Sequence, residues 1–198
     1  MALKYVNEID LSGKNVIVRF DFNVPLSKDG SGQITDTTRV DRALPTIKYI
    51  LENGCRKLIM MSHLGRPKGE FKPEFSFEPV AKYLAKKLEE EVLLTESCTD
   101  QGIKTMLKIN DQKIILLQNL RFHKEETKCE TNFAKLLASY GDVYINDAFG
   151  TSHRKHASTY EIVRYFNKNE IAGGFILKKE IEALSKITEN PQTPFVGI

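Results

Sequence analysis

The stretch Leu58-Ile59-Met60-Met61-Ser62-His63-Leu64-Gly65-Arg66 passes from an uninterrupted apolar run directly into a loop with polar side chains. A strand with one solvated face alternates apolar and polar residues, whereas a continuous apolar run is typical of a strand covered on both faces. We therefore predict that residues 58–61 form an interior strand of a parallel sheet. Residues 62–66 then form the loop at its carboxyl end.

Similar apolar runs recur along the chain and alternate with segments of helical periodicity. We expect further strands at residues 16–20, 92–94, 114–117, 143–145 and 195–198. Between them, apolar residues at helical spacing predict a helix over 40–51, which Pro45 should kink or restart and Asn53-Gly54 should end. We expect other helices after a Ser76 cap, over 101–109, after an Asn132 cap and over 175–188. This alternation predicts an α/β fold, a three-layer α/β/α sandwich with a parallel, Rossmann-like sheet.

The composition of the 198 residues is that of an ordinary globular domain. Hydrophobic residues make up 41% and charged residues 28%, which excludes disordered, collagen-like and coiled-coil chains. A net charge of +3 is too small to indicate nucleic-acid binding. No apolar run is long enough to span a membrane, and the first residues do not resemble a secretory signal, so we expect a cytoplasmic location and no membrane partner.

Several common catalytic motifs are absent from the sequence. It contains no P-loop, no nucleophile-elbow serine, no zinc-binding His-Glu-x-x-His and no protein-kinase signature. The segment 30–35 starts like a dinucleotide-binding loop, but it lacks the third glycine and does not lead directly from a strand into a helix. A nucleophile-based or zinc-based hydrolase therefore has no support in the sequence.

Polar side chains follow four of the expected strands. The first strand leads into Asp21-Phe22-Asn23 and the second into 62–66, while two later strands lead into 119–123 and 146–154. The carboxyl ends of parallel strands share one edge of the sheet, where open α/β folds bind ligands. We therefore expect Arg66, Arg121 and Arg154 to line one crevice together with His63, an aspartate and an asparagine.

The predicted ligand of this crevice is a small anion. Arginine presents a planar, permanently charged group that suits carboxylates and phosphates. Asp21 and Asn23 would then orient ligand hydroxyls. His63 is equally compatible with a structural role and with a ligand contact, whereas His153 and His156 favour a structural one. Arg39, near the start of a predicted helix, is unfavourably placed relative to the helix dipole unless an anion lies nearby.

The same segments resemble the signature blocks of the phosphoglycerate kinase family, in the family's order and spacing. The segment Val18-Arg19-Phe20-Asp21-Phe22-Asn23-Val24-Pro25 is one, and Ser62-His63-Leu64-Gly65-Arg66-Pro67 is a second. Further blocks are Asn119-Leu120-Arg121-Phe122-His123, Gly141-Asp142-Val143-Tyr144-Ile145-Asn146-Asp147-Ala148-Phe149-Gly150-Thr151 and Ala172-Gly173-Gly174-Phe175. The resemblance extends from about residue 16 to the last residue.

The resemblance implies a two-domain, hinge-bending glycolytic kinase. It would transfer a phosphoryl group reversibly between 1,3-bisphosphoglycerate with ADP and 3-phosphoglycerate with ATP. Its catalytic arginine would be Arg39, which would reach the transferring phosphoryl group; positioning and charge stabilisation dominate such chemistry. The substrate-binding residues that the resemblance implies are Asp21, Phe22, Asn23, Arg39, His63, Leu64, Gly65, Arg66, Arg121 and Arg154.

The family's glycine-rich nucleotide-binding blocks have no counterpart in these 198 residues. The resemblance therefore implies an N-terminal domain over 1–185 that binds 3-phosphoglycerate. Residues 186–198 would start the connection to a C-terminal domain that binds Mg-ATP or Mg-ADP, and this chain would be an inactive monomer by itself, with no cofactor or metal ligand of its own. The alternative is a stand-alone anion-binding α/β module without catalysis.

Overall fold

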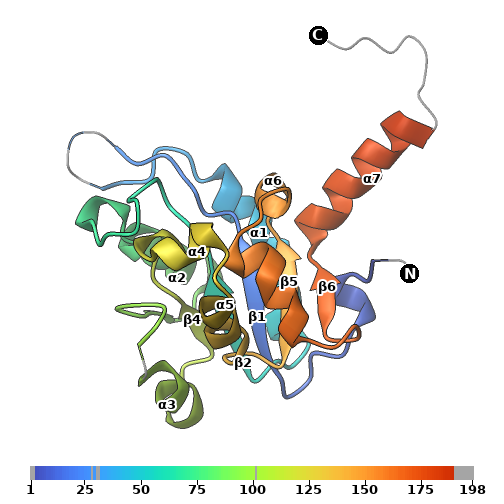
Figure 1. Ribbon diagram of the computed structural model, residues 1–198, viewed down its shortest axis with the longest axis horizontal. Helices are drawn as coiled ribbons and strands as arrows, with labels where there is room; N and C mark the ends of the chain where they lie inside the picture. Colours follow the sequence, from blue (N-terminus) through green and yellow to red (C-terminus); the bar gives the residue numbers. More distant parts are fainter. Residues whose placement is uncertain (1–2, 28, 30–31, 101, 190–198) are drawn as a thin grey trace.

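The computed structural model describes residues 3–27, 29, 32–100 and 102–189. It contains a six-stranded, entirely parallel sheet in the order β3-β4-β2-β1-β5-β6 (Figure 1). The strands are β1 (Asn15–Phe20), β2 (Lys57–Met61), β3 (Val92–Leu94), β4 (Ile114–Leu116), β5 (Val143–Asp147) and β6 (Ile171–Gly173). Helices cover both faces, which confirms the predicted three-layer, Rossmann-like fold.

Alternate residues of each strand point to opposite faces of the sheet and supply two separate cores. One core joins Val16, Val18 and Phe20 of β1 to α1 (Thr38–Glu52), α2 (Glu78–Leu88) and the start of α7 (Phe175–Glu189). The other joins Ile17 of the same strand to α3 (Gly102–Ile109) and α5 (Thr131–Ala138). Burial on both faces explains why these strands read as continuous apolar runs.

Five of the predicted strands are confirmed, with β5 two residues longer than expected. The sixth predicted strand, 195–198, lies outside the described residues. Strand β6 was not predicted, because its three residues include a glycine and give no apolar run. It extends the sheet through parallel pairing of Ala172 with Ile145 of β5.

The predicted helices are confirmed, with corrections at their ends. Helix α1 continues through Pro45, so a restart there was wrong. The residue at the N-cap of α2 is Phe77, although Ser76 Oγ accepts a hydrogen bond from Glu78 N at 3.3 Å. Helix α5 starts at Thr131 after a Glu130 cap, which places Asn132 inside its first turn.

Short helical elements complete the structure. Two of them, α4 (Lys124–Lys128) and the π-helix η4 (Ala157–Glu161), become important below. Helix α7 extends away from the sheet in Figure 1, and the predicted domain boundary at 185/186 falls within it and stays a prediction. The other short elements are η1 (Val6–Glu8), η2 (Pro73–Phe75), η3 (Leu120–Phe122), α6 (Phe149–Ser152) and η5 (Ile162–Tyr165).

Candidate anion-binding site

The loops that follow β1, β2, β4 and β5 lie along the carboxyl edge of the sheet, as the parallel topology requires. Two buried polar side chains tie these loops together. Ser62 Oγ donates to Phe20 O at 2.7 Å and accepts from Phe22 N at 2.8 Å. Asn119 bonds both the backbone N and the backbone O of Leu64, at 3.2 and 2.7 Å, and its Oδ1 also accepts from Arg121 N at 3.0 Å. Hydrogen bonds between these two side chains and backbone atoms therefore hold the loops after β1, β2 and β4 in place.

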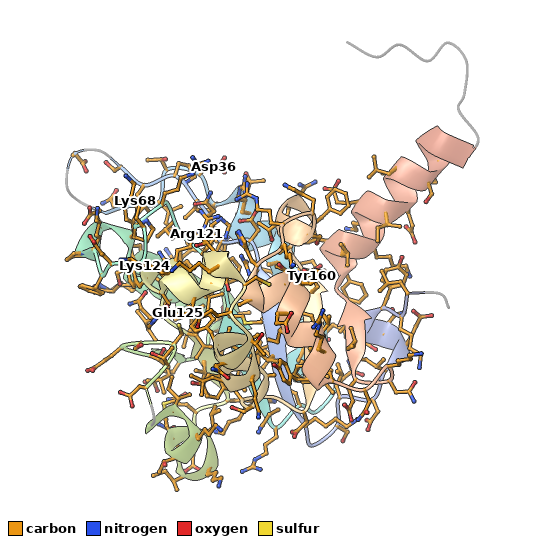
Figure 2. All side chains as sticks on the ribbon, in the orientation of Figure 1. Asp36, Lys68, Arg121, Lys124, Glu125 and Tyr160 are labelled. Atoms are coloured by element: carbon orange, nitrogen blue, oxygen red, sulfur yellow. The ribbon has the colours of Figure 1, made fainter. Side chains whose placement is uncertain are left out.

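Three predicted arginines share one cavity at this edge. Arg66, Arg121 and Arg154 line a hollow of about 360 Å³, together with Lys68 and Thr127. Figure 2 shows Arg121 and Lys68 on the same side of the molecule. Arg121 donates through one terminal nitrogen to Gly65 O at 2.7 Å. Within the described ranges, none of the three arginines forms an ion pair with a carboxylate. The cavity thus gathers positive charges that form no direct ion pair with a described carboxylate, which suits an anion.

Asp21 and Arg39 lie in a second hollow of about 350 Å³, where they form an ion pair with each other. Gly150 lines the same hollow. Asp21 is therefore not an isolated negative charge that would repel an anionic ligand. Arg39 keeps about half of its side chain exposed, so its guanidinium remains accessible.

Asn23, Leu64 and Gly65 line a third hollow, of about 640 Å³. Asn23 Oδ1 accepts from Gly65 N at 2.8 Å. Predicted residues thus line three hollows at one edge of the sheet, and their convergence on a single ligand stays a prediction. The side chains of Phe22 and Leu64 are buried in the hydrophobic core. There, the ring of Phe22 stacks on the ring of Phe20.

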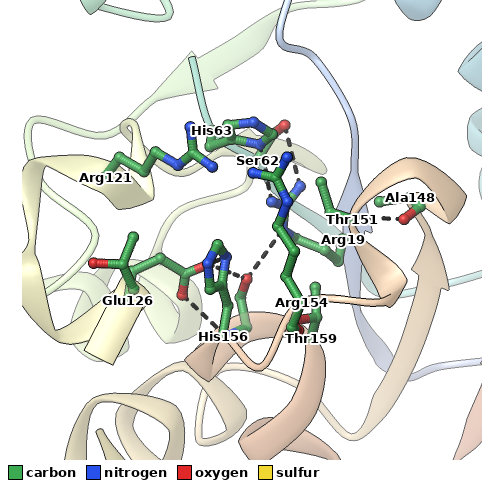
Figure 3. A network of polar contacts seen from close by, with 12 residues as sticks. Arg19, Ser62, His63, Arg121, Glu126, Ala148, Thr151, Arg154, His156 and Thr159 are labelled. Atoms are coloured by element: carbon green, nitrogen blue, oxygen red, sulfur yellow. Dashed lines mark hydrogen bonds and ion pairs between the residues drawn. The ribbon is translucent and has the colours of Figure 1, made fainter. Parts of the chain in front are cut away.

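Beneath the arginines lies a buried charge that we did not predict as a site residue. Arg19 is 1% exposed and points from β1 toward the face of the sheet that carries α5. Its Nε donates to Ser158 Oγ at 3.0 Å, one terminal nitrogen lies 3.0 Å from His63 Nδ1, and the other donates to Phe20 O (Figure 3). The only sequence signal was a single arginine within an otherwise apolar strand, and its partners are remote in the sequence.

Two histidines next to these arginines are held in the neutral form. Burial, followed by the charges of Arg19 and Arg121, lowers the pKa of His63 far below its usual range. Burial, followed by the charges of Arg121 and Arg19, lowers the pKa of His156 to about 4. His63 is 3% exposed, while His153 is exposed. Neither His63 nor His156 therefore adds to the positive charge at neutral pH.

The negative counterpart of Arg19 is Glu126 of α4, which is fully buried. Its two carboxylate oxygens accept from Ser158 N at 3.0 Å and Ser158 Oγ at 2.6 Å. Burial raises the pKa of Glu126 and the charge of Arg19 opposes that rise. Since both oxygens act as acceptors, the geometry is that of an ionised carboxylate.

The described residues contain no group of three or more His, Cys, Asp or Glu side chains placed to hold a metal ion. No described helix is both long enough and apolar enough to cross a membrane. The arginine-lined cavity at the carboxyl edge suits a small anion.

Comparisons with known proteins agree with this arrangement. The family model described as phosphoglycerate kinase matches residues 6–198. Phosphoglycerate kinases of Clostridium novyi (strain NT) and Aquifex aeolicus (strain VF5) are 49% and 46% identical to it, each over 98% of this chain and 48% of their own length. The chain thus spans about half the length of these relatives.

Solved structures show the same likeness. The structure of phosphoglycerate kinase from Coxiella burnetii superposes with a TM-score of 0.83 at 39% identity, over 98% of this chain and 47% of that one. The enzyme from Pyrococcus horikoshii OT3 also gives a TM-score of 0.83, at 27% identity over 97% of this chain and 47% of that one. With a fold, a site and a sequence of this kind, the chain belongs to the phosphoglycerate kinase family.

Proposed function

We propose that this chain is the substrate-binding part of a phosphoglycerate kinase and that it binds 3-phosphoglycerate and 1,3-bisphosphoglycerate. The observation that carries the proposal is the cavity lined by Arg66, Arg121 and Arg154, which have no carboxylate partner within the described residues. A phosphate group with two negative charges satisfies such a cluster better than a single carboxylate does.

The neighbouring hollows suggest roles for the remaining residues. Asp21 lines the hollow that contains Arg39 and Asn23 lines the third hollow, and they would bind the glycerate hydroxyl and carboxylate region. Arg39 is more exposed than Arg121 and would exchange its contact with Asp21 for the transferring phosphoryl group. No protein nucleophile is needed, because this kind of transfer depends on positioning and charge stabilisation.

The nucleotide belongs, in this proposal, to the region that the relatives have and this chain does not span. Mg-ATP or Mg-ADP bound by a C-terminal domain in cis would donate or accept the phosphoryl group. The described residues of this chain offer no metal-holding group of three or more side chains, and we assign them no step with the metal. The proposal therefore predicts substrate binding without turnover for these 198 residues, as a cytoplasmic monomer.

The test is a titration of the chain with 3-phosphoglycerate, followed by amide chemical shifts and by calorimetry. We expect shifts at Arg39, Arg66, Arg121 and Arg154, and about tenfold weaker binding for Arg154→Gln, the loss of one hydrogen bond to a charged group. Arg56→Gln is the matched control, because Arg56 is exposed and precedes β2 at the opposite edge of the sheet.

The possible outcomes separate the proposal from its alternative. Absence of shifts at all four arginines rejects the assignment of the site. Equal affinity for inorganic phosphate and 3-phosphoglycerate favours a stand-alone anion-binding module. Turnover of 3-phosphoglycerate and Mg-ATP by the purified chain rejects the proposal that turnover needs a separate nucleotide-binding domain.

A further inference from the structure

A buried chain of hydrogen bonds runs from α4 to the loop that follows β2. Glu126 accepts two bonds from Ser158, and Ser158 Oγ in turn accepts from Arg19 Nε at 3.0 Å. A terminal nitrogen of Arg19 then lies 3.0 Å from His63 Nδ1. All four side chains are at most 3% exposed, so water does not compete for these contacts.

The order of donors and acceptors along this chain is fixed by chemistry. Arg19 has only donors, so Ser158 Oγ must accept from it and is left with its own hydrogen for Glu126. For the same reason His63 Nδ1 must be an acceptor, which places the single proton of the neutral imidazole on Nε2. His63 is thereby set as a neutral hydrogen-bond donor through Nε2.

Glu126 also determines where the neighbouring helix lies. Its bond to Ser158 N anchors the π-helix η4, and Tyr144 of β5 donates to Ser158 O at 2.9 Å. The segment before η4 carries Arg154, and His156 Nδ1 lies 3.8 Å from Glu126 Oε1. A single buried carboxylate therefore contacts the segment that carries one arginine of the cavity and, through Ser158, the guanidinium that orients His63.

We propose that Glu126 is a positioning residue for the anion site, acting through Ser158 on Arg19 and His63 and through η4 on Arg154. This inference rests on the proposed function for its ligand, 3-phosphoglycerate. It assigns to Glu126 and Ser158 no contact with substrate.

The direction in which Glu126→Gln changes the affinity for an anion distinguishes a positioning role of Glu126 from a purely electrostatic one. Removing a negative charge beside a cluster of arginines should tighten anion binding if Glu126 acts only through its field. Glutamine cannot accept both bonds: with its oxygen on the Ser158 N–H, its amide nitrogen faces Ser158 Oγ, which would have to accept a second hydrogen bond and turn its own hydrogen away. If Glu126 positions the cluster, Glu126→Gln instead weakens binding of 3-phosphoglycerate by about tenfold, the equivalent of one lost bond to a charged group.

Ser158→Ala is the second variant, because it breaks the link to Arg19 and leaves the charge of Glu126 in place. We expect it to weaken binding by a similar factor. The matched control is Glu161→Gln. Glu161 is a buried glutamate of η4, the helix that contains Ser158, and its side chain contacts Thr131 and Arg164 and not the arginine cluster. Thermal unfolding of each variant shows whether it is folded at the temperature of the titration.

A measurement on the unmodified chain does not depend on ligand or variant. Nitrogen NMR of the histidine rings should show His63 as the Nε2-protonated tautomer with no titration between about pH 5 and 8. In Ser158→Ala, we expect a mixture of tautomers, which a purely structural role for Ser158 would not produce.

Three results would overturn the inference: a His63 ring protonated at Nδ1 in the unmodified chain, tighter binding in Glu126→Gln, or unchanged binding in both variants. If the unmodified chain does not bind 3-phosphoglycerate while the tautomer is as expected, the proposed function fails and the hydrogen-bond chain stands.

Discussion

One face of strand β1 packs only apolar side chains, whereas the other face carries a guanidinium into the interior. Val16, Val18 and Phe20 join the core formed with α1 and α2. On the opposite face, Ile17 is followed by Arg19, which is satisfied by Ser158 and His63 and balanced by Glu126. The first face contributes stability through hydrophobic burial alone, while the second exchanges part of that stability for a preorganised site.

The largest expected effect comes from removing the buried charge. Arg19→Met leaves Glu126 without its compensating cation, so we expect the free energy of unfolding to fall by about 3–5 kcal/mol. Ile17→Val, two residues earlier on the same face, should cost only about 0.5–1.5 kcal/mol. Urea unfolding followed by circular dichroism measures both.

The double variant Arg19→Met with Glu126→Met completes this comparison. An apolar pair removes both charges, so its loss of stability should be much smaller than the sum of the two single losses. Additive losses would mean that the two side chains do not compensate each other. The contrast between the faces of β1 would then be one of packing and not of charge.

The difference between the faces also marks how far the sequence could predict the structure. Strands β1 to β5 and the helix predicted over 175–188 follow from apolar runs and periodicity, which depend on neighbouring residues. Arg19 did not stand out, because its meaning depends on Ser158 and Glu126, more than 100 residues away in the chain. Parallel topology placed the four polar loops at one edge, but the division into three hollows depends on side-chain contacts such as Asp21 with Arg39.

We expect a lower pH to reduce the free energy of unfolding through the histidines that lie near Arg19. His156 is held neutral with a pKa of about 4, and the pKa of His63 is lower still, against about 6.5 in an unfolded chain. The unfolded state therefore binds protons that the folded state does not, so stability falls as the pH drops below 6.5. Each histidine should cost about 2 kcal/mol between pH 7 and pH 5.

The measurement is urea unfolding at both pH values for the unmodified chain and for His156→Gln. The variant should lose less stability on acidification, because His156 no longer contributes. His153→Gln serves as the control, since His153 is exposed. An identical loss in all three proteins would place the acid sensitivity elsewhere in the molecule.

Gly65 lies where the two regions meet, since its carbonyl accepts from Arg121 and its Cα faces Phe75, which packs against the apolar core. Its φ of +61° disfavours other residues, and a Cβ would lie 2.3 Å from the Phe75 ring. We expect Gly65→Ala to lower the free energy of unfolding by about 2 kcal/mol and also to weaken binding of 3-phosphoglycerate.

Gly13→Ala isolates the backbone part of this effect. Gly13 has a similar φ of +67°, and an added Cβ would meet nothing within 4 Å. Its cost should be about 1 kcal/mol, with binding unchanged. Equal costs at the two glycines would show that Phe75 moves aside without penalty and that the loop is not fixed by the apolar core.

The smallest effect is expected from an exposed ion pair on the surface of α2. Glu78 and Lys82 pair at 2.7 Å one turn apart on α2, and both side chains are largely exposed. Water already solvates both ions and salt screens them, so Glu78→Gln should leave the urea midpoint unchanged within error at 0.5 M salt. A loss as large as that of Arg19→Met would contradict the view that burial makes the interior charges costly to break. Burial would then not distinguish Arg19 and Glu126 from charged pairs on the surface.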